Sequence, residues 1–272
     1  MKGKLDWQSQ RVVNIWDEIT LWSAPFGRLL LENIPMGTEW NVVDLGFGTG
    51  FPLIELSQRF GNGSTIYGVD IWPAGINKTK EKIEVLTLSN VKLIEQSATS
   101  IPLKNNSVDL ISSNLGVNNF DEREKVYHEC YRILKKDSRI CLTTNPVGTF
   151  KELFELFEII FLEFDDSKLI QNLKNSISRR GTKDSIVQEL KEVGFTLTKE
   201  ISDKTNFRFV DPLALLDHSL IRLGFLDSWE SMVPKELHSV FFKRLQEEIQ
   251  KKIDANGEFS ISVPMLYLEF KK

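Results

Sequence analysis

A short β-branched run that ends in a cluster of glycines is the feature that most constrains the fold of this chain. Residues 41–45 read NVVDL, and the glycine-rich turn GFGTG follows at residues 46–50. Pro52 then opens an apolar stretch, at a position where the first turn of a helix tolerates proline. A strand, a glycine turn and a helix in this order indicate one unit of a parallel α/β sheet.

The alternation of strands and helices continues along the chain. Apolar residues between positions 76 and 86 recur at helical spacing, and other helical stretches separate further β-branched runs. This pace predicts an α/β fold with a doubly wound, mostly parallel sheet of seven strands. The strands after the first are expected at residues 65–70, 91–94, 108–112, 139–143, 195–201 and 258–270.

Four segments are expected along the chain. They are an N-terminal helical lid at 1–38, a sheet core at 39–206, a helical cap inserted at 207–256, and a final strand at 257–272 that returns to the core sheet. The cap is expected because about 50 residues separate the last two strands, which is too long for a loop without structure of its own. Pro25 and Gly27 should interrupt the helical lid.

The charge balance argues against general nucleic-acid binding. The chain has 34 Lys and Arg against 38 Asp and Glu, a net charge of −4, and so lacks a basic footprint.

Two cysteines and three scattered histidines predict neither a disulfide framework nor a metal site. No apolar run approaches ~18 residues, so no membrane-spanning helix is expected. We expect a cytoplasmic protein with a small-molecule partner. Its oligomeric state stays open, and a homodimer is compatible with the sequence.

The glycine turn predicts a ligand site. Open α/β sheets bind ligands at the carboxyl ends of their strands, where a following helix offers free N–H groups. Asp70 ends the second strand, where its carboxylate can accept hydrogen bonds from both hydroxyls of a ribose, and Ile71 and Trp72 could pack on an adenine. A dinucleotide fingerprint needs a third glycine where Phe51 stands, and the Gly-Lys sequence of a phosphate loop is absent.

Together these residues resemble the small-molecule branch of the class I S-adenosylmethionine-dependent methyltransferases. The resemblance covers roughly residues 40–145. It rests on DLGFGTG at 44–50, Asp70, SATSIP at 97–102, VDLIS at 108–112 and YRILK at 131–135. It implies a Rossmann-like fold, S-adenosylmethionine as cofactor and S-adenosylhomocysteine as product.

The resemblance also implies a role for particular residues. The backbone of Gly46, Phe47, Gly48 and Gly50 would face the cofactor carboxylate. Asp44 would lie near its amino group, and Asp70 would hold its ribose. Ser97 replaces the aspartate that relatives often use for the adenine amino group. The remaining implied contacts are Ile71 and Ala98 beside the adenine, and Asn114 and Leu115 near the sulfonium.

The implied reaction is direct displacement at the sulfonium methyl by a small, partly apolar acceptor, with proximity supplying most of the effect. A general base is needed only if the acceptor must lose a proton, and the candidates are His218, Asp17 and Glu18. The segment NLGVNN at 114–119 is not the NPPY type that serves base N-methylation, and two cysteines do not suit an arsenite-type acceptor. A non-catalytic S-adenosylmethionine-binding protein and an NAD-dependent oxidoreductase stay open as alternatives.

The layout of the family that the chain resembles implies that aromatic residues of the expected lid and cap surround a partly apolar pocket mouth. The alternative is that these residues only pack the cap against the sheet. A separate stripe of phenylalanines at 150, 154, 157, 161 and 164 has helical spacing. Core packing is the favoured interpretation of the stripe, and a pocket wall or dimer seam is the alternative. The residues expected at the mouth are Trp16, Trp22, Phe26, Phe207, Phe209, Phe225 and Trp229.

Overall fold

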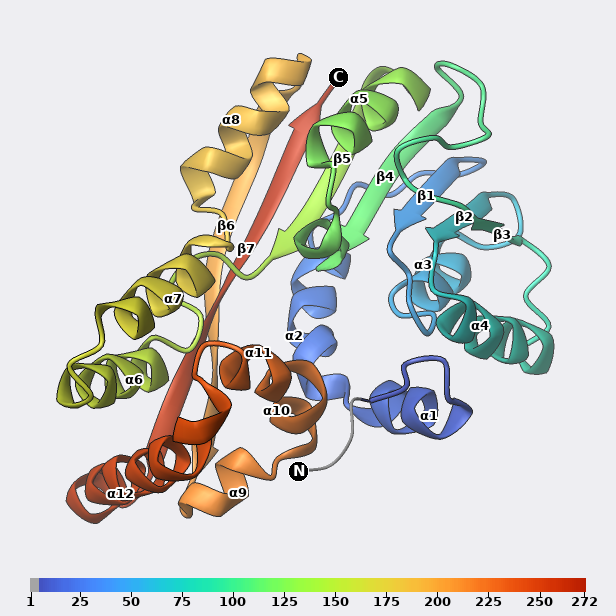
Figure 1. Cartoon of the computed structure of the whole chain (residues 1–272). Helices are drawn as coiled ribbons and strands as arrows, with labels where there is room; N and C mark the ends of the chain where they lie inside the picture. Colours follow the sequence, from blue (N-terminus) through green and yellow to red (C-terminus); the bar gives the residue numbers. More distant parts are fainter. Residues whose placement is uncertain (1–4) are drawn as a thin grey trace. The chain divides into compact units, whose positions relative to one another are not determined.

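Seven strands form one sheet in the computed structural model, which describes residues 5–272 (Figure 1). The strand order is β3-β2-β1-β4-β5-β7-β6. Strands β1 to β5 pair in parallel, and β7 pairs antiparallel with β5. The predicted α/β class and strand number are therefore confirmed. The strands are β1 (Asn41–Leu45), β2 (Thr65–Asp70), β3 (Val91–Glu95), β4 (Val108–Asn114), β5 (Leu134–Thr144), β6 (Thr196–Phe209) and β7 (Phe259–Lys271).

Helices connect and cover these strands. The α-helices are α1 (Gln10–Glu18), α2 (Thr20–Leu31), α3 (Leu53–Phe60), α4 (Pro73–Val85), α5 (Arg123–Ile133), α6 (Lys151–Glu163), α7 (Ser167–Ser178), α8 (Lys183–Val193), α9 (Pro212–Leu216), α10 (Ser219–Gly224), α11 (Leu226–Glu230) and α12 (His238–Asn256). Two short 3-10 helices are η1 (Gly116–Asn119) and η2 (Lys235–Leu237). No helix among residues 5–272 is both long and apolar enough to cross a bilayer.

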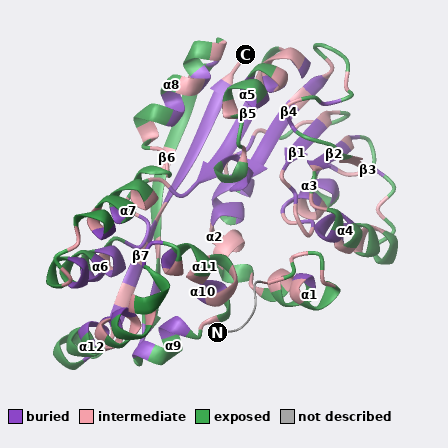
Figure 2. Ribbon diagram, viewed as in Figure 1, coloured by how far each residue is buried: buried purple, intermediate pink, exposed green. Residues whose placement is uncertain are grey.

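Burial of the central strands explains their continuous apolar sequence. Val42, Val43 and Leu45 are all at most 1% exposed, and β4 is buried along most of its length (Figure 2). One face packs against α5 and α8 in a core that includes Ile133 and Leu190. Helix α2 contacts β4 and β5 from the other face (Figure 1). A strand covered on both faces loses the polar alternation of a half-exposed strand.

The chain divides into two compact units. The first holds residues up to Thr144 together with 183–202 and 265–272, and the second holds 145–182 and 203–264. Strands β6 and β7 are shared, because each continues from one unit into the other. Residues 145–182 thus belong to the same unit as the expected cap, whereas the expectation from the sequence was that they belong to the core. The expected bounds of lid, core and cap remain a prediction, and residues 1–4 of the lid lie outside the described residues.

Aromatic packing holds the second unit together. Phe157 meets Phe241 edge-to-face at 4.9 Å between ring centroids, and Phe150 meets Phe225 in the same way at 4.8 Å. Phe154 and Phe161 are buried as well. Edge-to-face pairs of this kind each add about 0.5–1.5 kcal/mol beyond their buried area. Core packing of the phenylalanine stripe is therefore confirmed within this unit.

Two local expectations were wrong. The helical lid is not interrupted at Pro25, which lies inside α2; the break comes at Ile19, whose φ of −83° and ψ of 67° are not helical. The buried residues Phe26 and Leu30 hold α2 together in spite of the missing N–H. Helix α7 was not expected either, although Leu169, Leu173 and Ile177 recur at helical spacing and the Asp166 side chain caps the helix by accepting the Lys168 N–H.

Candidate active site

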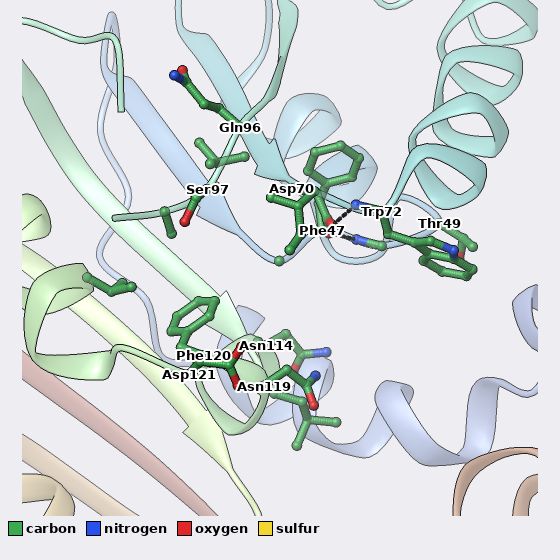
Figure 3. Close-up of a pocket in the computed structure, with 18 of the residues that line it drawn as sticks. Phe47, Thr49, Asp70, Trp72, Gln96, Ser97, Asn114, Asn119, Phe120 and Asp121 are labelled. Carbon is green, nitrogen blue, oxygen red and sulfur yellow. Dashed lines mark hydrogen bonds between the residues drawn. The ribbon is translucent and has the colours of Figure 1, made fainter. Parts of the chain in front are cut away.

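A pocket of about 480 Å³ lies at the carboxyl ends of β1, β2 and β4 in the first unit (Figure 3). Its lining comes from the turns that follow these strands and β3, and from α2 and the end of α1. Parallel strands bring their carboxyl ends to one edge, so segments far apart in sequence meet there. The size is in the range of small-molecule and cofactor sites.

The glycine turn after β1 folds tightly against the turn after β4. Gly46 and Gly48 have φ values of +73° and +54°, which favour glycine. A Cβ on Gly46 would lie 3.0 Å from Gly116 Cα, and a Cβ on Gly116 would lie 2.5 Å from Leu45 O. A Cβ on Gly48 would meet nothing within 4 Å, since this glycine faces open space. The turn therefore exposes bare backbone to the pocket.

Asp70 joins the end of β2 to the glycine turn. Its Oδ2 accepts a hydrogen bond from the Gly48 N–H at 2.7 Å, and its Oδ1 accepts one from the Trp72 N–H at 2.8 Å. The carboxylate lines the pocket (Figure 3). Because an ionised carboxylate has about four lone-pair sites, each oxygen can still accept a bond from a ligand hydroxyl.

Asp44 lies behind the glycine turn. It is fully buried, and Ser112 Oγ donates a hydrogen bond to its Oδ1 at 2.8 Å. Its Oδ2 has no partner among residues 5–272. Burial raises the pKa of Asp44 to about 7, against the lowering effect of the Ser112 bond, and the nearby Asp70 charge adds to the rise. A buried carboxylate oxygen without a partner is suited to a cationic ligand group.

The turn after β3 forms another side of the pocket. Ser97 Oγ lies 2.9 Å from Thr99 Oγ1 and accepts a bond from the Thr99 N–H at 3.2 Å, so this hydroxyl stabilises its own turn. Ala98 is buried, whereas Ile71 across the pocket is 68% exposed. Gln96 also lines this side (Figure 3). This side of the pocket therefore combines the apolar Ala98 with the polar Gln96 and Ser97.

The turn after β4 is held in a strained conformation. Leu115 has a φ of +64°, and its N–H donates to Thr143 O at 3.0 Å. Asn114 is fixed by Thr143 Oγ1, which donates to its Oδ1 at 2.7 Å, and by its own Nδ2, which donates to Ser23 O at 3.2 Å. A left-handed conformation at a non-glycine residue costs about 1–3 kcal/mol and is typical of functional sites.

The N-terminal segment docks on the same edge. Trp72 Nε1 donates to Trp7 O at 2.9 Å, and the Trp7 ring meets Trp16 edge-to-face at 5.2 Å between ring centroids. Lys82 donates to Thr49 O at 2.9 Å and also pairs closely with Asp17. Trp16 and Trp22 line the pocket. The glycine turn is therefore held from the outside by α1 and α4.

Most of the predicted cofactor residues line this pocket, but Asp44 and Gly50 do not. Asp44 is buried behind the turn, and Gly50 faces Ile54 and Thr79. Asp17 and Glu18 are absent from the lining, and Asp17 is engaged by Lys82. His218 belongs to the second unit, where its Nδ1 accepts the Leu220 N–H at 3.3 Å and its ring lies beside Phe207 and Phe209.

Several lining residues were not predicted. They share a place directly after the strand ends, and that position is the sequence signal that could have found them. Asp121 and Glu124 have the spacing of a capping box, but the N-cap residue of α5 is Glu122, and no side-chain cap bond forms. The lining residues missed there are Thr49, Phe51, Gln96, Thr99, Gly116, Asn119, Phe120, Asp121 and Glu122, and Ser23 in α2, Val69 in β2 and Val126 in α5 were missed as well.

Comparison with known proteins identifies the family. Residues 43–142 match a family model described as a methyltransferase domain. A ubiquinone/menaquinone biosynthesis C-methyltransferase from Campylobacter jejuni is 31% identical over 186 residues, which are 63% of this chain and 75% of that protein. An arsenite methyltransferase from Halobacterium salinarum is 30% identical over 102 residues, 38% of this chain and 26% of that protein.

The fold has the same relatives. A crystal structure of an S-adenosylmethionine-dependent methyltransferase from Aquifex aeolicus superposes with a TM-score of 0.55 at 19% identity, over 73% of this chain and 93% of that one. Neither alternative, the oxidoreductase or the non-catalytic binding protein, gains support from these matches. This chain therefore belongs to the class I S-adenosylmethionine-dependent methyltransferases, and it transfers a methyl group to a small molecule.

Proposed function

We propose that the pocket in the first unit holds S-adenosylmethionine across the ends of β1, β2 and β3, and admits a small, partly apolar acceptor beside β4. One observation carries the proposal. The bare glycine turn and the Asp70 carboxylate share one pocket and are bonded to each other. A carboxylate at the end of β2 is suited to the two ribose hydroxyls, and open backbone at Gly48 is suited to close approach of the methionine part.

The buried residues behind the pocket fit the cofactor as well. The unpartnered Oδ2 of Asp44 is suited to a cationic amino group. Ile71 and Ala98 would flank the adenine, with Trp72 beside them. Ser97 would contribute weakly, because its hydroxyl already serves its own turn. Asn114 and Leu115 would form the floor near the reacting centre, at a position fixed by the bonds of Asn114 to Thr143 and Ser23.

The cofactor, when bound, supplies an already activated methyl group, so the protein has to align the acceptor and exclude water. Trp16, Trp22, Phe51 and Phe120 line the pocket and would do both for a partly apolar acceptor. We propose that positioning rather than a base from Asp17, Glu18 or His218 carries the rate. The two relatives named above differ in the acceptor that their names indicate, so the acceptor of this enzyme is argued from its own pocket.

The cysteines bear on the acceptor and on the compartment. Cys130 and Cys141 are both free and buried, and neither lines the pocket. Burial raises the pKa of both thiols, for Cys141 to about 12. Inert thiols of this kind do not suit an arsenite-type acceptor. Free thiols are also compatible with our proposal that the enzyme works in the reducing cytoplasm.

Calorimetric titration tests the cofactor assignment. S-adenosylmethionine and S-adenosylhomocysteine should bind the purified protein with one-to-one stoichiometry, and NAD should not. Binding of NAD alone, or of none of the three, would overturn the proposed site. Methyl transfer from labelled cofactor to compounds of a small, partly apolar panel would then confirm the acceptor class.

A further inference from the structure

The acceptor side of the pocket is built by two segments. Asn119, Phe120 and Asp121 follow β4, and Trp22 and Ser23 come from α2. Figure 3 shows Asn114, Asn119, Phe120 and Asp121 gathered on one side of the pocket, across from Phe47, Asp70 and Trp72. Under the proposed function the latter group binds the cofactor, so the former group faces the acceptor.

Every ionisable side chain that lines this pocket is acidic. The three are Asp70, Asp121 and Glu122, and no lysine, arginine or histidine belongs to the lining formed by residues 5–272. Glu122 already forms a close ion pair with Lys125, which does not line the pocket. Asp70 is engaged with backbone N–H groups at the cofactor side. Asp121 is thus the charge that the acceptor would meet.

Asp121 is free to bind a ligand. Its side chain makes no hydrogen bond or ion pair with residues 5–272, and it is exposed to the pocket. The simplest structural role of an acid before a helix is to cap it, but α5 has no side-chain cap bond. Asn119, two residues earlier, likewise directs a polar side chain at the same side of the pocket (Figure 3).

The turn that leads from β4 toward Asp121 is well fixed at its start. The Leu115 N–H donates to Thr143 O at 3.0 Å, and the Asn118 N–H donates to Leu115 O at 3.1 Å. Gly116 rests against Leu45 O so closely that no side chain fits there. The start of the segment that carries Asp121 therefore needs little ordering on binding, which favours affinity.

Aromatic rings complete this side. Trp22 and Phe120 line it, and Trp16 lies at its edge. The faces of aromatic rings attract cations, most strongly for tryptophan. An anionic acceptor would instead lose its hydration without finding a positive partner, which is strongly unfavourable in a partly closed pocket.

We propose that the acceptor carries a basic nitrogen that is protonated at neutral pH, with Asp121 accepting its N–H and Trp22 and Phe120 flanking the cation. The proposal rests on the proposed function, because it assigns the rest of the pocket to S-adenosylmethionine. It concerns recognition of the acceptor and applies whichever acceptor atom is methylated. Acceptors that carry only a carboxylate or phosphate are excluded.

A matched set of ligands tests this proposal on the full chain loaded with S-adenosylhomocysteine. Phenethylamine, phenethyl alcohol and hydrocinnamate share one skeleton with a cationic, neutral and anionic end, and tryptamine, tryptophol and indolepropionate share another. Tryptophan fluorescence or calorimetry gives each dissociation constant. Of the two amines, the one with the lower dissociation constant should bind roughly tenfold or more tightly than the alcohol and the acid of the same skeleton. This difference is expected for a charge-assisted hydrogen bond.

Two variants assign the effect to Asp121. Asp121→Asn should remove most of the preference for the amine while S-adenosylhomocysteine still binds. Glu124→Gln, which removes a carboxylate from the first turn of α5 outside the pocket, should retain the preference and so controls for the helix dipole. The proposal would be overturned if the acids bind as tightly as the amines or more tightly, or if the alcohols bind equally well. It would also be overturned if neither amine binds, or if Asp121→Asn keeps the preference for the amine. If S-adenosylhomocysteine does not bind to the native chain, the proposed function itself is overturned.

Discussion

Asp70 and Gly48 are joined by a hydrogen bond of 2.7 Å from the glycine N–H to the carboxylate Oδ2, so the end of β2 holds the turn that follows β1. The residue that would bind the ribose is thus also the residue that shapes the neighbouring backbone. Removing its charge should affect both the direct contact and the preorganisation of the turn.

We expect Asp70→Asn to weaken S-adenosylmethionine binding by about 1.5–3 kcal/mol, which is roughly a 10- to 150-fold rise in Kd. Calorimetry measures this directly. Glu95→Gln is the matched control, because Glu95 pairs in register with Asp70 at the end of β3 but does not line the pocket. An equal loss in both variants would point to a general charge effect and against a specific role of Asp70.

Asp44 should make the stability of the free protein depend on pH. Its folded pKa of about 7 lies above the ordinary 3.8, so the folded state holds an extra proton between these values. The stabilising contribution is therefore complete below about pH 4 and is lost as the pH rises through 7, by on the order of 4 kcal/mol at ~1.4 kcal/mol per pKa unit. Urea unfolding between pH 5 and 8.5 should show a decline that Asp44→Asn lacks.

Cofactor binding should reverse the preference of Asp44 for the proton. A cationic amino group near Oδ2 favours the ionised carboxylate, so binding near pH 7 should release a fraction of a proton. Calorimetry in buffers of different ionisation enthalpy measures the number released. Asp44→Asn should release less, and an unchanged number in this variant would contradict placement of the amino group beside Asp44.

Gly116→Ala should displace the turn after β4 from the end of β1 and so disturb the cofactor site. Its Cβ would lie 2.5 Å from Leu45 O and 2.6 Å from Ser113 Oγ, both part of a buried contact between β1 and β4. We expect a loss of about 1–3 kcal/mol of unfolding free energy and weaker cofactor binding. Gly257→Ala is the control, because Gly257 is left-handed, with a φ of +80° and a ψ of −14°, but has open space around it.

The control separates strain from overlap. Gly257→Ala should lose only the ~1–2 kcal/mol of a left-handed alanine and leave the Kd for the cofactor unchanged. Unfolding in urea and calorimetry on both variants check the pair. If Gly116→Ala binds the cofactor as tightly as the native protein does, close packing of the turn after β4 against β1 is not needed for the site.

Lys82→Met should loosen the N-terminal segment. Lys82 joins α4 to Thr49 O at 2.9 Å and to Asp17 in α1, and the variant leaves Asp17 without this partner. Hydrogen exchange in residues 10–18 should become faster, and the Kd for S-adenosylmethionine should rise several-fold. Lys78→Met removes a cation of the same helix that pairs only at 3.4 Å with Glu81, and it should change neither quantity.

The cofactor side of the site was predictable because its signals are local. A strand, a glycine turn and an acid at the next strand end are read from short stretches, and parallel topology then brings them together. Gly46, Gly48 and Asp70 meet in the pocket for this reason. Asp44 was predicted to lie near the cofactor, yet its burial behind the turn depends on Ser112 from another strand.

The rest of the site depends on contacts between distant segments. The bond from Trp72 to Trp7 O spans 65 residues, and nothing in either stretch specifies it. Asp121 has the spacing of a helix cap, and only the tertiary course of the turn after β4 directs it to the pocket. Pro25 shows the opposite case, in which burial of Phe26 overrides a local helix-breaking signal.

The place of β7 between β5 and β6 has a consequence for synthesis on the ribosome. Strand β6 is complete at Phe209, yet the strand that pairs with it begins only at Phe259. The nascent chain therefore carries a long strand with an unsatisfied edge while residues 210–258 are still being made. Such an edge is a template for wrong pairing. The exposed face of β6 carries charged residues such as Glu200, Lys204 and Arg208, which would discourage association of nascent chains with one another.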